Sequence, residues 1–103
     1  MKTYLVIWDL EARNSLKEIY LYIQKESPSA AKKVRNEILK ITKKLHKMPE
    51  RFVSERYLTH KGKEYHSFTK WSYKIIYRIS EREIRILAIV HTSRNTNLIE
   101  GIQ

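Results

Sequence analysis

The stretch SPSAAKKVRNEILKITKKLHKMP, residues 27–49, carries the strongest structural signal in this sequence. Its apolar residues recur three and four positions apart, the spacing of one face of an α-helix, at Ala31, Val34, Ile38, Ile41, Leu45 and Met48. Ser27 is a favourable N-cap, Pro28 fits the first helical position, and Pro49 stops the helix. The pattern therefore predicts an amphipathic helix over residues 28–48 that buries one apolar stripe.

Another helix is expected immediately before this one. Residues 3–8 are aliphatic, aromatic and β-branched, which predicts a buried strand, and Asp9 after them is a plausible N-cap. The apolar spacing that follows predicts a helix from residue 10 to about Glu26. Because only Ser27-Pro28 joins the two helices, we expect them to form an antiparallel hairpin.

Beyond Pro49 the apolar period changes to that of β-strands. We expect three to four strands, with a short one near residues 55–58 as the open alternative to a loop and the others over residues 64–71, 73–79 and 84–91. A polar turn at 80–83 makes the last two a hairpin, and Trp8 and Trp71 are expected to be packed. The order predicts an α+β fold, with a helical hairpin on one face of a mainly antiparallel sheet. Because 103 residues is about the size of one small domain, we expect a single domain, 1–103.

The charge of the chain is strongly positive and unevenly distributed. Lys and Arg number 21 and Asp and Glu 11, which gives a net charge of +10. Residues 1–28 are neutral overall, residues 29–48 carry seven basic groups against Glu37 alone, and residues 56–85 carry eight basic and three acidic groups. So large a charge on a small domain attracts polyanions, namely nucleic acid, an anionic membrane or an acidic protein.

Several classes of protein are excluded by what the sequence lacks. With no Cys, the chain has no disulfide scaffold, thiol nucleophile or Cys-based zinc site. No His-Glu-x-x-His motif or other ligand spacing is present, so we expect no metal and no cofactor. No apolar run is long enough to span a bilayer, and the N-terminus is unlike a signal peptide. We therefore expect a cytoplasmic protein with no membrane partner.

Four segments, taken in order, resemble a known family: the joint Ser27–Lys33, the stripe ending in Met48-Pro49, the strand Trp71–Tyr77, and the closing segment Ile86–Asn95. Together they resemble the RelE/ParE superfamily of toxins from type II toxin–antitoxin systems, over about residues 3–97. The resemblance implies a helical hairpin on a mostly antiparallel sheet, an acidic cognate antitoxin as partner, and roles in growth inhibition and plasmid stabilisation.

The resemblance leaves the target open between two branches. ParE-like toxins act on DNA gyrase, and RelE-like toxins cut messenger RNA in the ribosomal A site. The long hairpin with its Ser-Pro-x-Ala-Ala joint favours the ParE-like branch. A third possibility, based on charge alone, is a non-toxic basic nucleic-acid-binding module.

If the chain is an endoribonuclease, the resemblance implies three catalytic residues. Lys74 stands where RelE-like nucleases place an Arg after the Tyr of the penultimate strand, and Arg94 matches their Arg beyond the last strand. Both would stabilise charge on the phosphate. His91 approximates their C-terminal His and would transfer a proton, since a histidine can act as acid or base near neutral pH.

The nuclease pattern is incomplete elsewhere. RelE-like nucleases hold further cations on the preceding strand, but this sequence has Tyr65 and Ser67 at those positions. They also use a Tyr near the C-terminus, whereas no Tyr follows Tyr77 here. His66 could supply a second histidine, although an exposed surface role is the simpler expectation for it. These departures leave the question of an enzyme activity open and favour gyrase over mRNA as the target.

Overall fold

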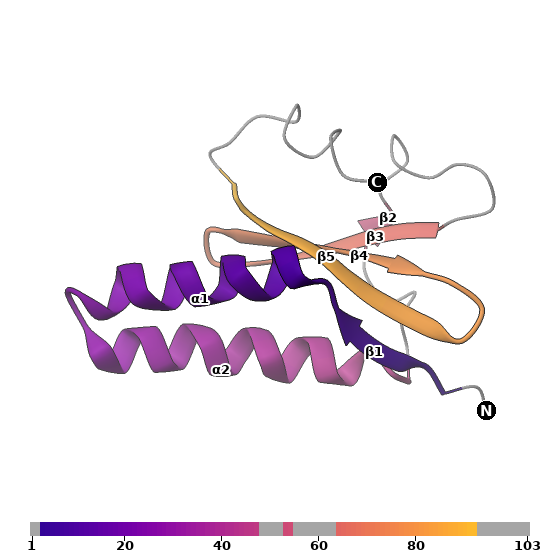
Figure 1. Cartoon of the computed structure of the whole chain (residues 1–103), viewed down its shortest axis with the longest axis horizontal. Helices are drawn as coiled ribbons and strands as arrows, with labels where there is room; N and C mark the ends of the chain where they lie inside the picture. Colours follow the sequence, from indigo (N-terminus) through magenta and orange to yellow (C-terminus); the bar gives the residue numbers. More distant parts are fainter. Residues whose placement is uncertain (1–2, 48–52, 55–63, 93–103) are drawn as a thin grey trace.

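The computed structural model describes residues 3–47, 53–54 and 64–92 of the chain. These described residues form two helices and five strands (Figure 1), which are β1 Leu5–Trp8, α1 Leu10–Gln24, α2 Pro28–Lys44, β2 Val53–Ser54, β3 Glu64–Lys70, β4 Tyr73–Ile79 and β5 Glu83–His91. The predicted strand near 55–58 and the predicted stop at Pro49 lie outside the described residues. Neither helix is long and apolar enough to cross a membrane.

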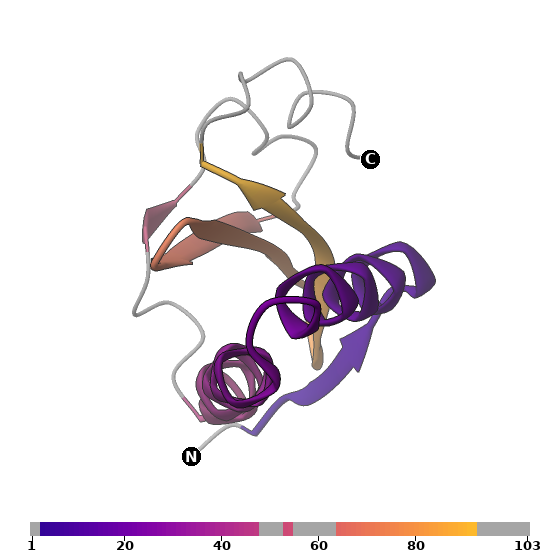
Figure 2. The same ribbon diagram turned by 90° about the vertical axis from the view of Figure 1, so that its left-hand side faces the viewer.

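The five strands form one sheet in the order β1-β5-β4-β3-β2. Strand β1 runs parallel to β5, and every other neighbouring pair is antiparallel. The hairpin of α1 and α2 covers one face of this sheet (Figure 2). The predicted α+β fold, with a helical hairpin on a mainly antiparallel sheet, is therefore confirmed.

The joint between the two helices is capped as the sequence predicts. The Ser27 Oγ accepts a hydrogen bond from the Ala30 amide at 3.2 Å, and Pro28 occupies the first turn. Helix α2 ends at Lys44, four residues before the predicted end. There the Leu45 amide donates a hydrogen bond to the Thr42 carbonyl, three residues earlier, so the helix ends in a tighter turn of the 3₁₀ type.

Apolar side chains are buried on both faces of the sheet. The larger cluster lies between the sheet and the helices and includes Ala12, Ile38, Leu45, Ile75, Tyr77 and Ile86. A smaller cluster of Tyr65, Ile76 and Leu87 lies on the opposite face. A bulge separates the pairs Ile76–Ala88 and Tyr77–Ile86, which leaves Leu87 without a partner across the ladder.

Loss of the Ile38 side chain should destabilise the domain more than any surface change on α2. The side chain is fully buried in the larger cluster, so Ile38→Ala removes apolar contacts and leaves a cavity. We expect a loss of about 2–5 kcal/mol in the free energy of unfolding, measured by urea denaturation. Lys33 is exposed, so Lys33→Ala should change the free energy of unfolding by under about 0.5 kcal/mol. Equal losses of stability in the two variants would contradict the burial of Ile38 in the core.

Candidate functional site

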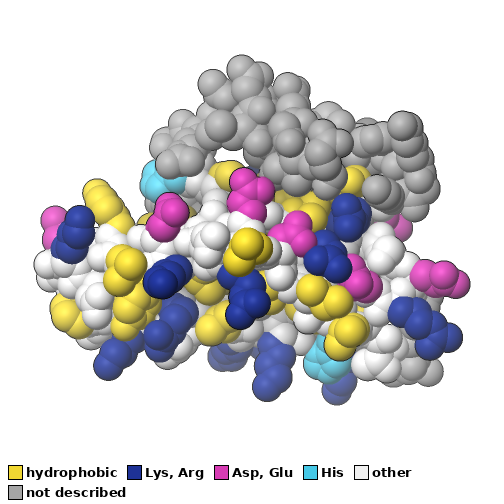
Figure 3. All heavy atoms as spheres, in the orientation of Figure 1, with side chains coloured by type: hydrophobic (Ala, Val, Ile, Leu, Met, Phe, Trp, Pro, Cys, Tyr) yellow, Lys and Arg dark blue, Asp and Glu magenta, His cyan; other side chains and the backbone are white. Residues whose placement is uncertain are grey.

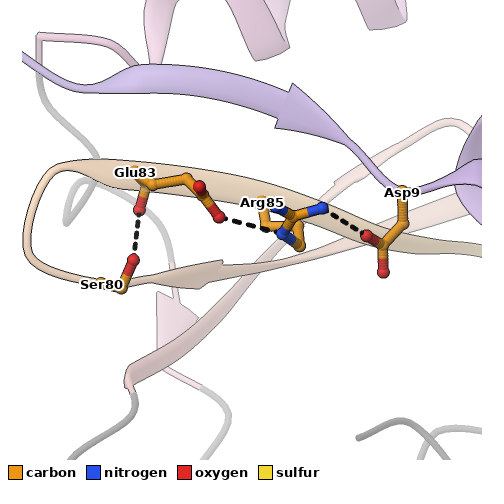
Figure 4. Close-up of polar contacts among 4 residues, drawn as sticks. All are labelled: Asp9, Ser80, Glu83 and Arg85. Atoms are coloured by element: carbon orange, nitrogen blue, oxygen red, sulfur yellow. Dashed lines mark hydrogen bonds and ion pairs between the residues drawn. The ribbon is translucent and has the colours of Figure 1, made fainter.

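Strand β1 forms one edge of the sheet and is tied to β5 by a side-chain clamp. Arg85 of β5 donates one hydrogen bond from Nη1 to Asp9 Oδ1 at 2.8 Å and another from Nε to Glu83 Oε2 at 2.9 Å (Figure 4). Ser80 Oγ donates to the Glu83 carbonyl at 3.2 Å, which closes the turn beside the clamp. The clamp thus holds the end of β1, where α1 begins, against the central strands.

The clamp changes the role predicted for Asp9. Asp9 occupies the N-cap position of α1, but its side chain makes no capping hydrogen bond. Its carboxylate instead accepts from Arg85, and this hydrogen bond, followed by the one to Glu83, raises the pKa of Arg85 above its already high ordinary value. Asp9 is therefore the N-cap residue as predicted, with its backbone carbonyl accepting from the Arg13 amide, while its side chain contributes to sheet pairing instead of capping.

A groove of about 600 Å³ lies where β1 meets the two helices. Its apolar lining includes Val6 and Trp8 of β1, Leu16 and Tyr20 of α1, and Leu39 of α2. Its cationic lining consists of Arg13, Lys17 and Arg35, and the Arg35 guanidinium lies 4.8 Å from the centre of the Tyr20 ring. An apolar groove lined with cations suits a peptide that carries both apolar and acidic side chains.

The backbone of β1 adds hydrogen-bonding groups to this groove. The amides of Leu5 and Asp9 donate to carbonyls of Arg82 and Ile86, each at 2.9 Å. Because successive amides of a strand point in opposite directions, those of Val6 and Trp8 point to the outer edge. Such an edge can pair with an added strand, which is a common mode of peptide recognition.

The three predicted catalytic residues do not form one described cluster. Lys74 lies in β4, His91 is the last residue of β5, and Arg94 lies outside the described residues. Across the β4–β5 ladder, Lys74 pairs with Val90, and His91 pairs with Tyr73. Since neighbouring residues of a strand point to opposite faces, Lys74 and His91 lie on opposite faces of the sheet. The structure therefore does not bring these two side chains together.

His91 lies on the helix-covered face, in a second pocket. Its ring meets the Tyr73 ring edge to face, with 5.7 Å between the centroids. The pocket measures about 720 Å³, and α1 contributes Glu18, Ile19 and Tyr22 to its lining. No group of three or more potential metal ligands occurs among the described residues, at this pocket or elsewhere.

Two further residues differ from expectation. The sequence predicts His66 at the surface, but the residue is only 5% exposed, because it pairs with Tyr77 on the sheet face that the helices cover. Its ring stacks on the Tyr77 ring, and its Nε2 donates a hydrogen bond to Glu64 Oε2 at 2.7 Å. Trp71 is 49% exposed rather than packed, because it forms the turn between β3 and β4, with a positive φ of 54°. No glycine or asparagine indicates this turn in the sequence.

Comparisons with known proteins bear on the whole chain. Residues 6–96 match the family described as "ParE toxin of type II toxin-antitoxin system, parDE". A solved structure described as "Chromosomal ParDE TA system from P. aeruginosa" is similar, with a TM-score of 0.67 and 22% identity. That match covers 86% of this chain and 96% of the other, and it shows a shared fold. No curated protein matches the sequence.

Proposed function

This chain belongs to the ParE toxin family of type II toxin–antitoxin systems, and from that membership we propose that it arrests bacterial growth by inhibiting DNA gyrase. The family match over residues 6–96 is the observation that carries this proposal, since the resemblance implies gyrase as the target of ParE-like toxins. The experiment that tests it is a supercoiling assay with purified gyrase, run beside a search for cut messenger RNA.

The arrangement of Lys74 and His91 supports an inhibitor over a nuclease. Cutting RNA through its own 2′-OH needs a proton-transfer group and phosphate-binding cations around a single phosphate. Lys74 and His91 lie on opposite faces of the sheet, and Tyr65 and Ser67 stand at positions where the nuclease pattern has cations. An endoribonuclease acting through these residues is therefore the weaker alternative.

An acidic antitoxin is the partner that fits the groove between β1 and the helices. Its apolar side chains would be buried against Trp8 and Leu39, while its carboxylates would meet Arg13, Lys17 and Arg35. Its backbone would pair with the outward-pointing amides of β1. Buried apolar contacts would supply most of the affinity, and the surrounding cations would mainly speed association.

The substitution Leu39→Asp should weaken antitoxin binding. Leu39 lines the groove and is 40% exposed, so the substitution places a carboxylate where an acidic, apolar segment would lie. We expect the dissociation constant to rise by about tenfold or more, measured by titration calorimetry with the antitoxin.

Leu21→Asp is the matched control for this substitution. Leu21 is 48% exposed, also lies within a helix, and lines the pocket at His91 instead of the groove. It should leave the affinity within about threefold of the parent, because surface changes away from contacts cost little. Equal losses in the two variants would show that the antitoxin does not use this groove.

A further inference from the structure

The face of α2 opposite its apolar stripe carries a row of lysines. Lys33 and Lys40 lie seven residues apart, so they form a line about 10 Å long on one side of α2, and Lys47 lies in the turn that follows the last helical residue, Lys44. Lys32, Lys43 and Lys44 flank this line, and all six are exposed. We call these six residues the lysine face; Figure 3 shows Lys and Arg side chains gathered along the lower edge of the molecule, where α2 runs.

The charge of the lysine face is not neutralised within the described part of the chain. Glu37 is the single acidic residue of α2, and it pairs with Lys70 of β3, with 3.9 Å between Nζ and Oε1. None of the ion pairs among the described residues includes a member of the lysine face. Within the described part of the chain, the six positive charges are therefore available to an external anion.

Helix stabilisation explains only part of this arrangement. Cations in the last turn of a helix interact favourably with its dipole, which accounts for Lys43 and Lys44. The effect falls off within one turn, so it does not account for Lys33 or Lys40. Lysines placed so close together also repel one another, which costs stability in the free protein.

We propose that the lysine face of α2 binds the phosphate backbone of duplex DNA. The toxin would make this contact to DNA directly, so the proposal does not depend on whether gyrase is the target. The wide major groove of B-form DNA admits an α-helix. Helix α2 could lie along that groove with its lysines directed to the phosphates that border it.

A protein partner fits this face less well than DNA does. Lysine is depleted in protein–protein interfaces, whose centres are apolar and rich in aromatic and Arg side chains. Lys33 and Lys40 have polar neighbours on this side of α2, namely Ser29, Asn36 and Glu37. Leu39, the exposed apolar residue of α2, lines the antitoxin groove together with Arg35. An acidic protein would thus find charge around Lys33 and Lys40 but no large apolar side chain to bury there.

Other nucleic acids also fit less well. Proteins hold single strands by stacking bases on aromatic side chains, and α2 has no aromatic residue. Duplex RNA has a deep, narrow major groove that side chains cannot read. A straight cationic helix with no stacking groups therefore favours B-form DNA.

The salt dependence of DNA binding tests this proposal. The full chain would be titrated into a labelled duplex of about 20 base pairs, with anisotropy recorded between about 50 and 200 mM salt. Each phosphate contact contributes about 0.9 to the slope of log K against log salt. The triple variant Lys33→Gln/Lys40→Gln/Lys47→Gln should therefore lower the magnitude of that slope by about 2.7, and Lys40→Gln alone by about 0.9.

A matched variant separates this face from net charge. Lys25→Gln/Arg82→Gln removes two exposed charges, from the C-terminal end of α1 and the β4–β5 turn, and should change the slope by less than about 0.9, whereas Lys33→Gln/Lys40→Gln should lower its magnitude by about 1.8. Equal slope changes in these two double variants, or no DNA binding by the parent, would overturn the proposal. So would polyglutamate or duplex RNA competing as well as unlabelled DNA at equal charge concentration. Circular dichroism confirms that each variant is folded.

Discussion

Induction of this chain in bacteria without an antitoxin should stop growth, and coexpression of its cognate acidic antitoxin should restore it. Membership of the ParE toxin family gives the reason for the arrest. The groove lined by Trp8, Leu39 and Arg35 gives the reason for the rescue, because a bound antitoxin would cover it. The measurement is viable count after induction, with and without the antitoxin.

Two controls accompany this induction. Expression of the antitoxin alone should leave growth unchanged, and Leu39→Asp should need more antitoxin for rescue than Leu21→Asp does. Normal growth while the full-length, folded chain accumulates would contradict the conclusion that this protein is an active toxin.

The substitution Arg94→Ala should strongly reduce toxicity without unfolding the protein. Arg94 lies outside the described residues; it matches the Arg that RelE-like nucleases place beyond the last strand, and we expect the position to serve a binding surface as well as a catalytic one. As a contact to a target protein, an arginine of this kind is worth about 2 kcal/mol or more, roughly 30-fold in affinity. The measurement is the inducer concentration needed for arrest, with circular dichroism as the check on folding.

His91→Gln is the informative comparison for Arg94→Ala. A general acid or base contributes about 10²–10⁴ to a rate, so a nuclease that depends on His91 would lose nearly all its toxicity. We expect toxicity to be retained, because His91 lies on the face opposite Lys74 and contacts Tyr73 beside α1. Loss of toxicity in His91→Gln, with the fold intact, would argue for proton transfer and against a non-enzymatic inhibitor.

The regular elements of the fold could be predicted because their signals are local. The stripe from Ala31 to Leu45 and the Ser27-Pro28 joint define α2 without reference to the rest of the chain, and the strand 73–79 matches β4 in full. The resemblance to the RelE/ParE superfamily rests on the same elements and is confirmed by the family match.

What the sequence did not reveal depends on contacts between distant residues. Asp9 resembles an ordinary helix cap until the parallel pairing of β1 with β5 brings Arg85 beside it. His66 resembles a surface residue until its strand pairs with β4 and places it over Tyr77.

The candidate site shows the same limit. The residues Lys74 and His91 could be named from the sequence, but their separation on two faces follows from the register of β4 against β5. The groove likewise combines residues from β1, α1 and α2, and its lining depends on how the hairpin packs on the sheet. Spacing along the chain carries no information about either arrangement.

The central claim, that this ParE-family toxin inhibits DNA gyrase, is tested most directly with purified components. The full chain would be added to gyrase, ATP and relaxed plasmid DNA, and the supercoiled product would be followed on agarose gels. Ribosomes carrying messenger RNA would receive the same toxin preparation, with mapping of RNA ends. The account predicts that supercoiling is lost as toxin is added, that antitoxin restores it, and that the messenger RNA stays intact. Unchanged supercoiling together with cuts in A-site codons would contradict it.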